Sequence, residues 1–134
     1  MANALFPKWK EQLLQFTANN NLSAGTVKVA LIDTGTYTYS STDQFWSAAS
    51  AASVGTPQTI GSKTCTNGVF DGADVTFTAV TGNSVEALII YIDTGTAGTS
   101  PLVAYIDTSV TGLPVTPNGG DITITWNASG IFAL

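Results

Sequence analysis

Apolar and polar residues alternate with a period of two in several segments from residue 26 onward. This alternation is typical of β-strands that bury one face and expose the other. Three segments show it, at residues 26–33, 74–80 and 121–126. The positions expected to face inward are Val27, Val29, Leu31, Val75, Phe77, Ala79, Ile122, Ile124 and Trp126. The pattern predicts half-buried antiparallel strands.

Two further segments, 85–92 and 102–106, are nearly continuous apolar runs. Runs of this length predict central strands that are covered on both faces. Turns are expected at Asn67-Gly68 and at 118–120, because asparagine and glycine tolerate the backbone angles that tight turns require. Residues 54–60 predict a loop, followed by another strand near 63–66.

The pattern before residue 26 has a helical period instead. Four apolar residues recur there at spacings of 4, 4 and 3, namely Leu5, Trp9, Leu13 and Phe16. This spacing places them on one face of an amphipathic helix, and Pro7 suits the first turn of such a helix. The asparagines at 19–21 are expected to end it. The helix either covers one end of the β core or forms an arm that docks on a neighbouring subunit.

A second short helix is compatible with residues 43–52, where Ser41 and Gln44 have capping-box spacing and alanines follow. The fold class predicted is mainly β. We expect an antiparallel β-sandwich or partly closed barrel of six to eight strands, with a short N-terminal helix and this optional second one. At 134 residues the chain fits a single domain over 1–134. Its parts are an N-terminal helical segment or arm over 1–20 and a β core over 26–134.

Charged residues are scarce and unevenly distributed. They make up 10% of the chain, the net charge is −5, and no positive residue follows Lys63. Binding to nucleic acid needs clustered cations, so a nucleic-acid partner is not expected. The absence of histidine removes the usual base of serine and cysteine hydrolases. With only one cysteine, zinc sites of the His/Cys type are excluded as well. We expect no enzyme activity and no cofactor.

The N-terminus does not predict a secretion signal, because Lys8, Lys10 and Glu11 interrupt its apolar residues. No apolar run is long enough to span a bilayer, so a membrane partner is not expected either. The lone Cys65 cannot form a disulfide within the chain.

The triplet Asp-Thr-Gly occurs at 33–35 and at 93–95, and Asp107-Thr108-Ser109 is a related third copy. Aspartic proteases carry this triplet, because two facing carboxylates share one proton and activate water. The two copies are only 60 residues apart, however, which is short for a two-lobed protease. Turns at the ends of strands explain all three copies more simply. In such turns the Asp side chain accepts a backbone hydrogen bond and Gly supplies positive φ.

A calcium site is a second candidate. Asn67, Asp71 and Asp74 offer clustered oxygens of the kind that calcium prefers. Their spacing matches no established calcium loop, and Asn-Gly and Asp-Gly pairs ordinarily mark turns. No metal site is predicted.

The three tryptophans are the largest side chains to place. Trp126 lies on the apolar side of its predicted strand and is expected in the core. Trp9 and Trp46 lie on the predicted helices. Each is either a core residue or an aromatic anchor of a subunit interface, and the sequence leaves both possibilities open.

Several segments occur in a recognisable order. They are VKVALID at 27–33, TNGVFDGADVTFTAV at 66–80, EALIIYIDTGT at 86–96, SPLVAYID at 100–107 and GLPVTPNGGDITITW at 112–126. A short helix precedes them, and an aromatic segment at 44–46 lies between the first two. In this order the chain resembles a family of small virion structural proteins of tailed bacteriophages.

The resemblance implies a structural role without catalysis. The chain is similar in size and composition to capsid decoration (cement) proteins, which bind the outer shell and stabilise the joints between capsomers. The implied partner is the major capsid protein, and the implied location is the outer surface of the capsid, after synthesis in the host cytoplasm. Self-association is implied too, with a trimer as one arrangement.

Under this hypothesis the expected interface anchors are Leu5, Phe6, Trp9, Leu13 and Trp46. The alternative within the virion is a tail, neck or fibre-base component. A module that binds host glycans is a second alternative, since β-sandwiches with exposed aromatic residues can stack against sugars.

Overall fold

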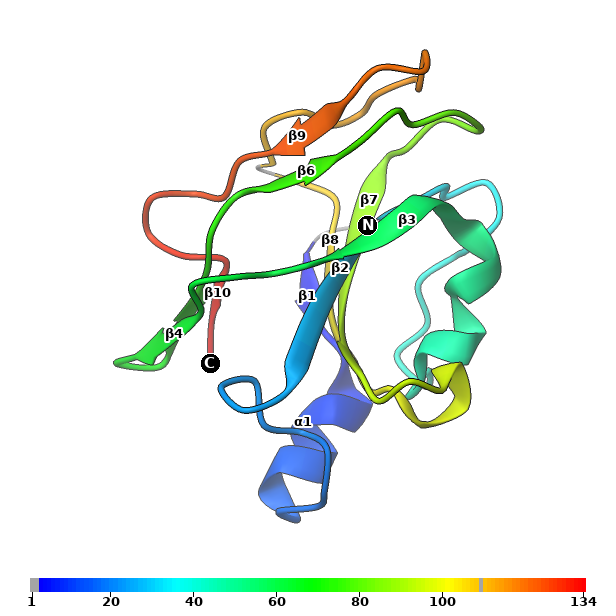
Figure 1. The fold of residues 1–134 in the computed structure, drawn as a ribbon. Helices are drawn as coiled ribbons and strands as arrows, with labels where there is room; N and C mark the ends of the chain where they lie inside the picture. Colours follow the sequence, from blue (N-terminus) through cyan, green and yellow to red (C-terminus); the bar gives the residue numbers. More distant parts are fainter. Residues whose placement is uncertain (1–2, 109) are drawn as a thin grey trace.

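The computed structural model describes residues 3–108 and 110–134. Within these ranges the fold is mainly β, with antiparallel sheets that do not close into a barrel, and the predicted fold class is confirmed in its sandwich-like form (Figure 1). The strands are β1 (Ala4–Leu5), β2 (Thr26–Ile32), β3 (Ser53–Thr59), β4 (Thr64–Thr66), β5 (Val69–Asp71), β6 (Val75–Phe77), β7 (Ala87–Asp93), β8 (Leu102–Ile106), β9 (Ile122–Ile124) and β10 (Phe132–Ala133). The α-helix is α1 (Pro7–Leu14), and the 3-10 turns are η1 (Trp46–Ala48), η2 (Ser50–Ala52) and η3 (Ala97–Thr99).

A five-stranded sheet in the order β1-β8-β7-β2-β3 forms the centre of the molecule. Its neighbouring strands are all antiparallel. β7 lies in the middle and buries six of its seven residues, while β8 buries all five. The prediction of central strands at 85–92 and 102–106 is therefore confirmed.

β2 is a central strand as well, although its sequence predicts a half-buried one. It pairs with β7 along its whole length, from Thr26 opposite Asp93 to Ile32 opposite Ala87. Val27 and Val29 are buried as predicted, but Ala30 and Ile32 on the other face are equally inaccessible. The second half of β2 is thus covered on both faces.

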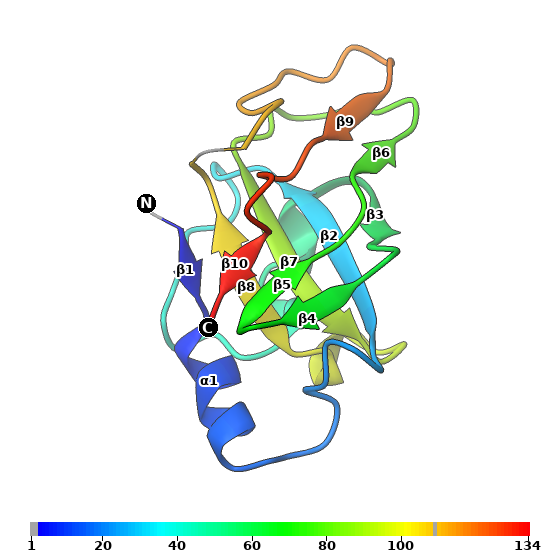
Figure 2. The same ribbon diagram turned by 90° about the vertical axis from the view of Figure 1, so that its left-hand side faces the viewer.

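Two smaller sheets cover one face of the central sheet. The three-stranded sheet β10-β5-β4 and the two-stranded sheet β6-β9 lie in front of it in Figure 2. In β6, Val75 and Phe77 are buried and Thr76 is exposed, as the alternation predicts, and β9 shows the same pattern. The alternation ends before Ala79, which is exposed with a φ of 52°, while Val80 is buried instead. The inward position predicted for Ala79 is therefore wrong.

The opposite face is covered by the segment between β2 and β3 (Figure 1). Trp46 stacks on Tyr91 of β7, with ring centroids 4.3 Å apart and an interplanar angle of 5°. The segment forms η1 and η2 rather than the helix predicted over 43–52. The backbone N–H of Trp46 donates to the Ser100 carbonyl oxygen (2.8 Å). Because this segment bonds across to the start of β8, a continuous helix does not form.

The edges of the central sheet are short or irregular. At one edge β1 has only two residues. At the other edge lies β3, where the sequence predicts a loop over 54–60, so that prediction is wrong. Pairing of β3 with β2 shifts register between Val29 and Leu31, Gly55 has a φ of 71°, and Pro57 has no N–H to donate. The sequence pattern does not indicate a strand here, because edge strands with glycine and proline do not show regular alternation.

Both predicted turns are observed. The strand expected near 63–66 is β4, which forms a hairpin with β5. Between them Asn67 and Gly68 have φ angles of 53° and 78°, and two positive φ values are characteristic of a type I′ hairpin turn. In the turn before β9, Gly119 has a φ of 88°, and the Asn118 side chain accepts a backbone hydrogen bond two residues on (2.9 Å).

The N-terminal segment begins as a strand and continues as a helix. Leu5 belongs to β1, which pairs with β8, so Leu5 does not share the helical face predicted for it. α1 starts at Pro7 as expected, but it ends at Leu14, so the prediction that the asparagines at 19–21 end it is wrong. Phe16 follows the helix in a left-handed conformation, with a φ of 57°. Residues 1 and 2 of the predicted arm lie outside the described ranges.

Two glycine-to-alanine substitutions test how tightly the covering layer packs. A Cβ at Gly72 would lie 2.3 Å from Cγ2 of the buried Ile60 and 3.1 Å from the Gly61 carbonyl oxygen. We expect Gly72→Ala to lower the free energy of unfolding by about 1–3 kcal/mol, because the branched Ile60 side chain cannot move aside. Urea denaturation measures the change.

Gly98→Ala is the matched control. A Cβ at Gly98 meets no atom within 4 Å, so we expect its stability to equal or exceed that of the unmodified protein by up to about 1 kcal/mol. Equal destabilisation by both substitutions would contradict the packing described for Gly72.

Candidate docking surface

Three of the five predicted interface anchors belong to the core. Phe6 and Trp9 are 0% and 2% exposed, and Trp46 is 7% exposed. The Trp9 indole packs edge-on against the ring of Phe132 in β10, with centroids 5.9 Å apart. In the isolated chain these three side chains hold α1 and η1 against the sheets, which is the core position that the sequence left open for the two tryptophans, and a role of the three in an interface stays a prediction. Leu5 and Leu13 are partly buried, and their place in an interface stays a prediction.

Exposed apolar side chains gather at one end of the molecule instead. Among the described residues, the large hydrophobic side chains that are exposed are Leu14 (90%), Phe16 (95%) and Leu134 (69%). The first two lie at the end of α1 and just after it. The C-terminal end of the described chain lies just above α1 in Figure 2.

A groove of about 650 Å³ connects these elements. We refer to it as the helical-end groove. Its walls come from α1, from the loop that follows it, from β4 and from the end of the chain. The residues lining it are Trp9, Gln12, Leu13, Phe16, Thr17, Ala18, Asn19, Asn20, Asn21, Leu22, Ser23, Cys65 and Leu134. None of these side chains is charged, so the groove offers an apolar surface with amide and hydroxyl groups around it.

The loop after α1 is held in shape by its own polar side chains. The Thr17 hydroxyl donates to Gln12 Oε1 (2.9 Å), and the Asn20 amide donates to Thr17 Oγ1 and to the Ala18 carbonyl oxygen (2.8 Å each). Asn21 Oδ1 accepts backbone hydrogen bonds at 2.9 and 3.1 Å. The groove wall is therefore built by local hydrogen bonds, which the sequence signalled only as an asparagine run.

Two buried polar atoms beside the groove have no hydrogen-bond partner within the described residues. They are Nε1 of Trp9 and Oδ1 of Asn20. Both residues line the groove. A buried polar group without a partner is costly, and native structures contain few of them. A molecule that supplied hydrogen-bond partners to these two atoms would therefore stabilise this part of the fold.

Sequence reasoning found only part of this surface. Leu13 and Phe16 were on the predicted helical face. The contributions of Leu22, Cys65 and Leu134 come from distant parts of the chain, and no periodic pattern links them. The C-terminal residues carried no signal at all.

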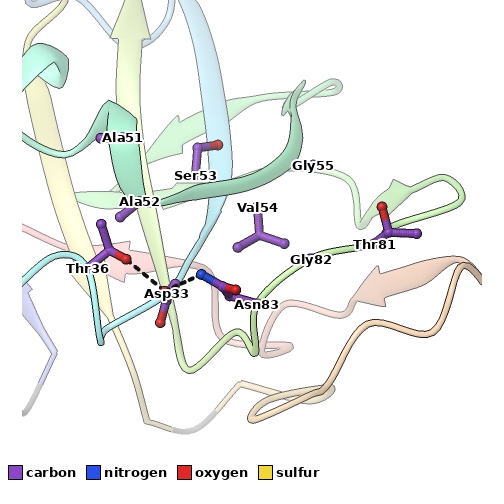
Figure 3. A pocket seen from close by; sticks show the side chains of 10 residues that line it. All are labelled: Asp33, Thr36, Ala51, Ala52, Ser53, Val54, Gly55, Thr81, Gly82 and Asn83. Atoms are coloured by element: carbon purple, nitrogen blue, oxygen red, sulfur yellow. Dashed lines mark hydrogen bonds between the residues drawn. The ribbon is translucent and has the colours of Figure 1, made fainter.

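A second, smaller pocket of about 250 Å³ lies where the turn after β2 meets the segment before β7 (Figure 3). Asp33 is at its base and is 9% exposed. One carboxylate oxygen accepts from the Gly35 N–H (2.9 Å). The other accepts from the Thr36 hydroxyl (2.8 Å) and the Asn83 amide (2.9 Å). These bonds, with that from Thr36 as the largest cause, hold the pKa of Asp33 below its ordinary value.

The Asp-Thr-Gly triplets are strand-end turns, as predicted, but the positive φ expected of the glycine occurs at Gly95 (91°) and not at Gly35. The Gly95 N–H donates to Asp93 Oδ1 at 2.9 Å, the same bond that Gly35 makes to Asp33. Asp33 directly follows β2, whereas Asp93 pairs with the first residue of that strand, Thr26. At about 3.3 Å per residue, the offset from Thr26 to Asp33 places the backbones of the two aspartates about 23 Å apart along the strand. The two carboxyl groups cannot share a proton, so the pair does not form an aspartic-protease site. Ser109 of the third copy lies outside the described ranges.

The residues considered for calcium are used by the fold itself. Asn67 forms the β4–β5 turn. Asp71 Oδ1 accepts from the Gly72 N–H (2.8 Å), and Asp74 Oδ1 accepts from the backbone N–H of Trp126 (3.0 Å). Within residues 3–108 and 110–134, no group of three or more His, Cys, Asp or Glu side chains is placed to hold a metal ion.

Comparison with known proteins identifies no relatives. Neither a scan against models of protein families nor a search of curated proteins finds a match to this chain. Among the described residues, no helix is both long and apolar enough to cross a membrane.

The burial of Trp9 predicts a large effect on stability. Trp9→Ala removes an indole that is 2% exposed, and we expect a loss of about 3–5 kcal/mol in the free energy of unfolding. Leu14→Ala, on the same helix but 90% exposed, is the control and should change stability by less than about 0.5 kcal/mol. Thermal and urea denaturation of both variants would show whether Trp9 is a core residue. A Trp9 variant as stable as the control would contradict its placement.

The carboxylate of Asp33 predicts a dependence of stability on pH. Its pKa is lowered in the folded state, so the unfolded chain binds this proton more readily. The stabilisation is present above the ordinary carboxyl pKa and is lost as the pH falls through the lower folded-state value. Urea midpoints measured from about pH 6 down to about pH 2.5 should therefore fall more steeply for the unmodified protein than for Asp33→Asn. Parallel curves would show that Asp33 is not held ionised by these bonds.

Proposed function

We propose that the chain is a structural protein of a tailed-phage virion, of the type that decorates the outside of the capsid. The proposal starts from the ordered segments that resemble small virion proteins. Those segments supply the strands of the central sheet and its cover, with 27–33 giving β2, 86–96 giving β7 and 100–107 giving β8. The resemblance thus involves the residues that build the fold.

The observation that carries a binding role is the helical-end groove. Exposed large apolar side chains on a small protein mark contacts with other molecules when they form a contiguous patch. Phe16 and Leu134 line one groove, whereas the exposed Leu14 of α1 does not line it. This end of the molecule is the face that we assign to the capsid.

A decoration protein of this kind stabilises a shell by adding contact area across joints between capsomers. Each contact is of modest size, but a molecule or oligomer that spans a joint binds at several points at once. Simultaneous attachment raises the overall affinity above that of any single contact. The apolar groove would supply the water-excluded centre of each contact, where most of the binding energy of an interface is found.

The tryptophans favour this role over glycan binding. Sugar-binding sites stack exposed aromatic faces against the sugar ring. Trp9, Trp46 and Trp126 are all buried, with at most 9% of each exposed. The three tryptophans offer no such face, and the exposed aromatic ring among the described residues is that of Phe16 in the helical-end groove.

The number and location of copies in purified virions test the proposal. Quantitative gel electrophoresis and cryo-electron microscopy should find the protein in hundreds of copies distributed over the outer shell. A dozen or fewer copies at one vertex or along the tail would assign it to the neck or tail instead. Absence from virions would overturn the structural role altogether.

A further inference from the structure

We propose that the helical-end groove binds a single peptide segment of another protein, with apolar side chains flanked by carboxylates. The inference rests on the proposed function for the identity of that protein, which is the shell subunit. The chemistry of the segment follows from the groove itself.

The floor and walls of the groove specify the apolar part of the segment. Leu13 lines the groove and is half-buried, while Phe16 and Leu134 line it and are exposed. An occupant that covers Phe16 and Leu134 removes apolar surface from water on both sides, and burying a phenylalanine side chain contributes about 1.5–3 kcal/mol. A segment with two or three aliphatic or aromatic side chains fits this volume.

The charges beside the groove specify its flanks. The lysines of α1 border the helix face that lines the groove: Lys10 is next to Trp9, and Lys8 lies one turn before Gln12. The acidic residue of the helix, Glu11, lies on the face turned away from the groove and pairs with Lys8 at 3.1 Å. A third lysine, Lys63, donates to the carbonyl oxygen of the lining residue Leu22 (2.9 Å).

Lys8 and Glu11 offset each other, so the excess positive charge next to the groove comes from Lys10 and Lys63, on a molecule of net charge −5. No lysine lines the groove itself, and the fourth lysine, Lys28, pairs with Asp93 at 2.8 Å. Charge complementarity favours an occupant that carries carboxylates next to its apolar residues.

The two unpartnered atoms favour a peptide over another apolar ligand. Trp9 Nε1 is a donor and Asn20 Oδ1 is an acceptor. A main-chain peptide unit offers one acceptor and one donor, so it can satisfy both. Both atoms are covered by their neighbours in this structure, so a peptide unit bonds to them only if it replaces part of the hydrogen bonding that holds the loop over 16–20.

Two other occupants fit less well. A second copy joined through the same face would bring Lys10 of each copy toward the other around a two-fold axis, with no acidic side chain in the groove to compensate. An anionic membrane would face the net charge of −5 over a wide area of the molecule, whereas a short peptide meets only the groove and the lysines next to it.

The test compares binding to expanded shells that were assembled without this protein. Phe16→Asn removes the ring from the groove, and asparagine suits the positive φ at that position. Leu14→Asn is the matched control, since Leu14 is equally exposed but does not line the groove. Lys10→Gln removes one charge beside it. Urea denaturation of each variant confirms that the fold is retained.

We expect Phe16→Asn to bind about 10- to 100-fold more weakly. Leu14→Asn should bind as the unmodified protein does. Lys10→Gln should bind about two- to five-fold more weakly, with a smaller dependence on salt. Equal binding by Phe16→Asn and the unmodified protein would overturn the groove proposal and leave the decoration role standing. Failure of the unmodified protein to bind shells would overturn the proposed function and this inference with it.

Two further measurements test whether a second copy or a membrane occupies the groove instead. If the unmodified protein is an oligomer by analytical ultracentrifugation and Phe16→Asn is a monomer, a second copy occupies the groove and the proposal is wrong. If the unmodified protein floats with vesicles containing phosphatidylserine and Phe16→Asn does not, the groove binds a membrane and the proposal is wrong as well.

Discussion

The burial of β7 on both faces is the constraint on which the rest of the structure depends. Six of its seven residues are inaccessible, so neither face of the central sheet can be left to water. Each face needs its own cover, and the two covers differ. Small sheets protect one face, and a segment of 3-10 turns with Trp46 stacked on Tyr91 protects the other. The fold is a sandwich because its middle strand allows no open side.

The parts that sequence predicted well are those whose pattern is set by burial alone. β7 and β8 are continuous apolar runs, and β6 and β9 alternate strictly. The burial of each of these strands can therefore be predicted from its own residues. The segment around Trp46 was missed, because its helical propensity is overridden by a backbone bond to Ser100, which lies far along the chain. β3 was missed, because an edge strand needs few apolar residues and tolerates Gly55 and Pro57.

For the candidate surface, too, the sequence pattern predicted only what neighbouring residues determine. The spacing of Trp9 and Leu13 identified an apolar helix face, but not whether that face meets its own core or another protein. In the structure the two residues of this face have different roles. Trp9 packs on Phe132 in the core, and Leu13 lines the groove. Leu134 completes the groove from the far end of the sequence, and only the folded chain brings the two together.

The irregular edges of the central sheet have a consequence for crowding. A row of unpaired N–H and C=O groups at a sheet edge is a template on which another chain can form a strand, and such pairing leads to aggregation. Here one edge has two residues, and the other is interrupted by Pro57 and a register shift. Copies held side by side at high local concentration can therefore remain separate folded units. They can be packed densely on a lattice without merging their sheets into a fibre.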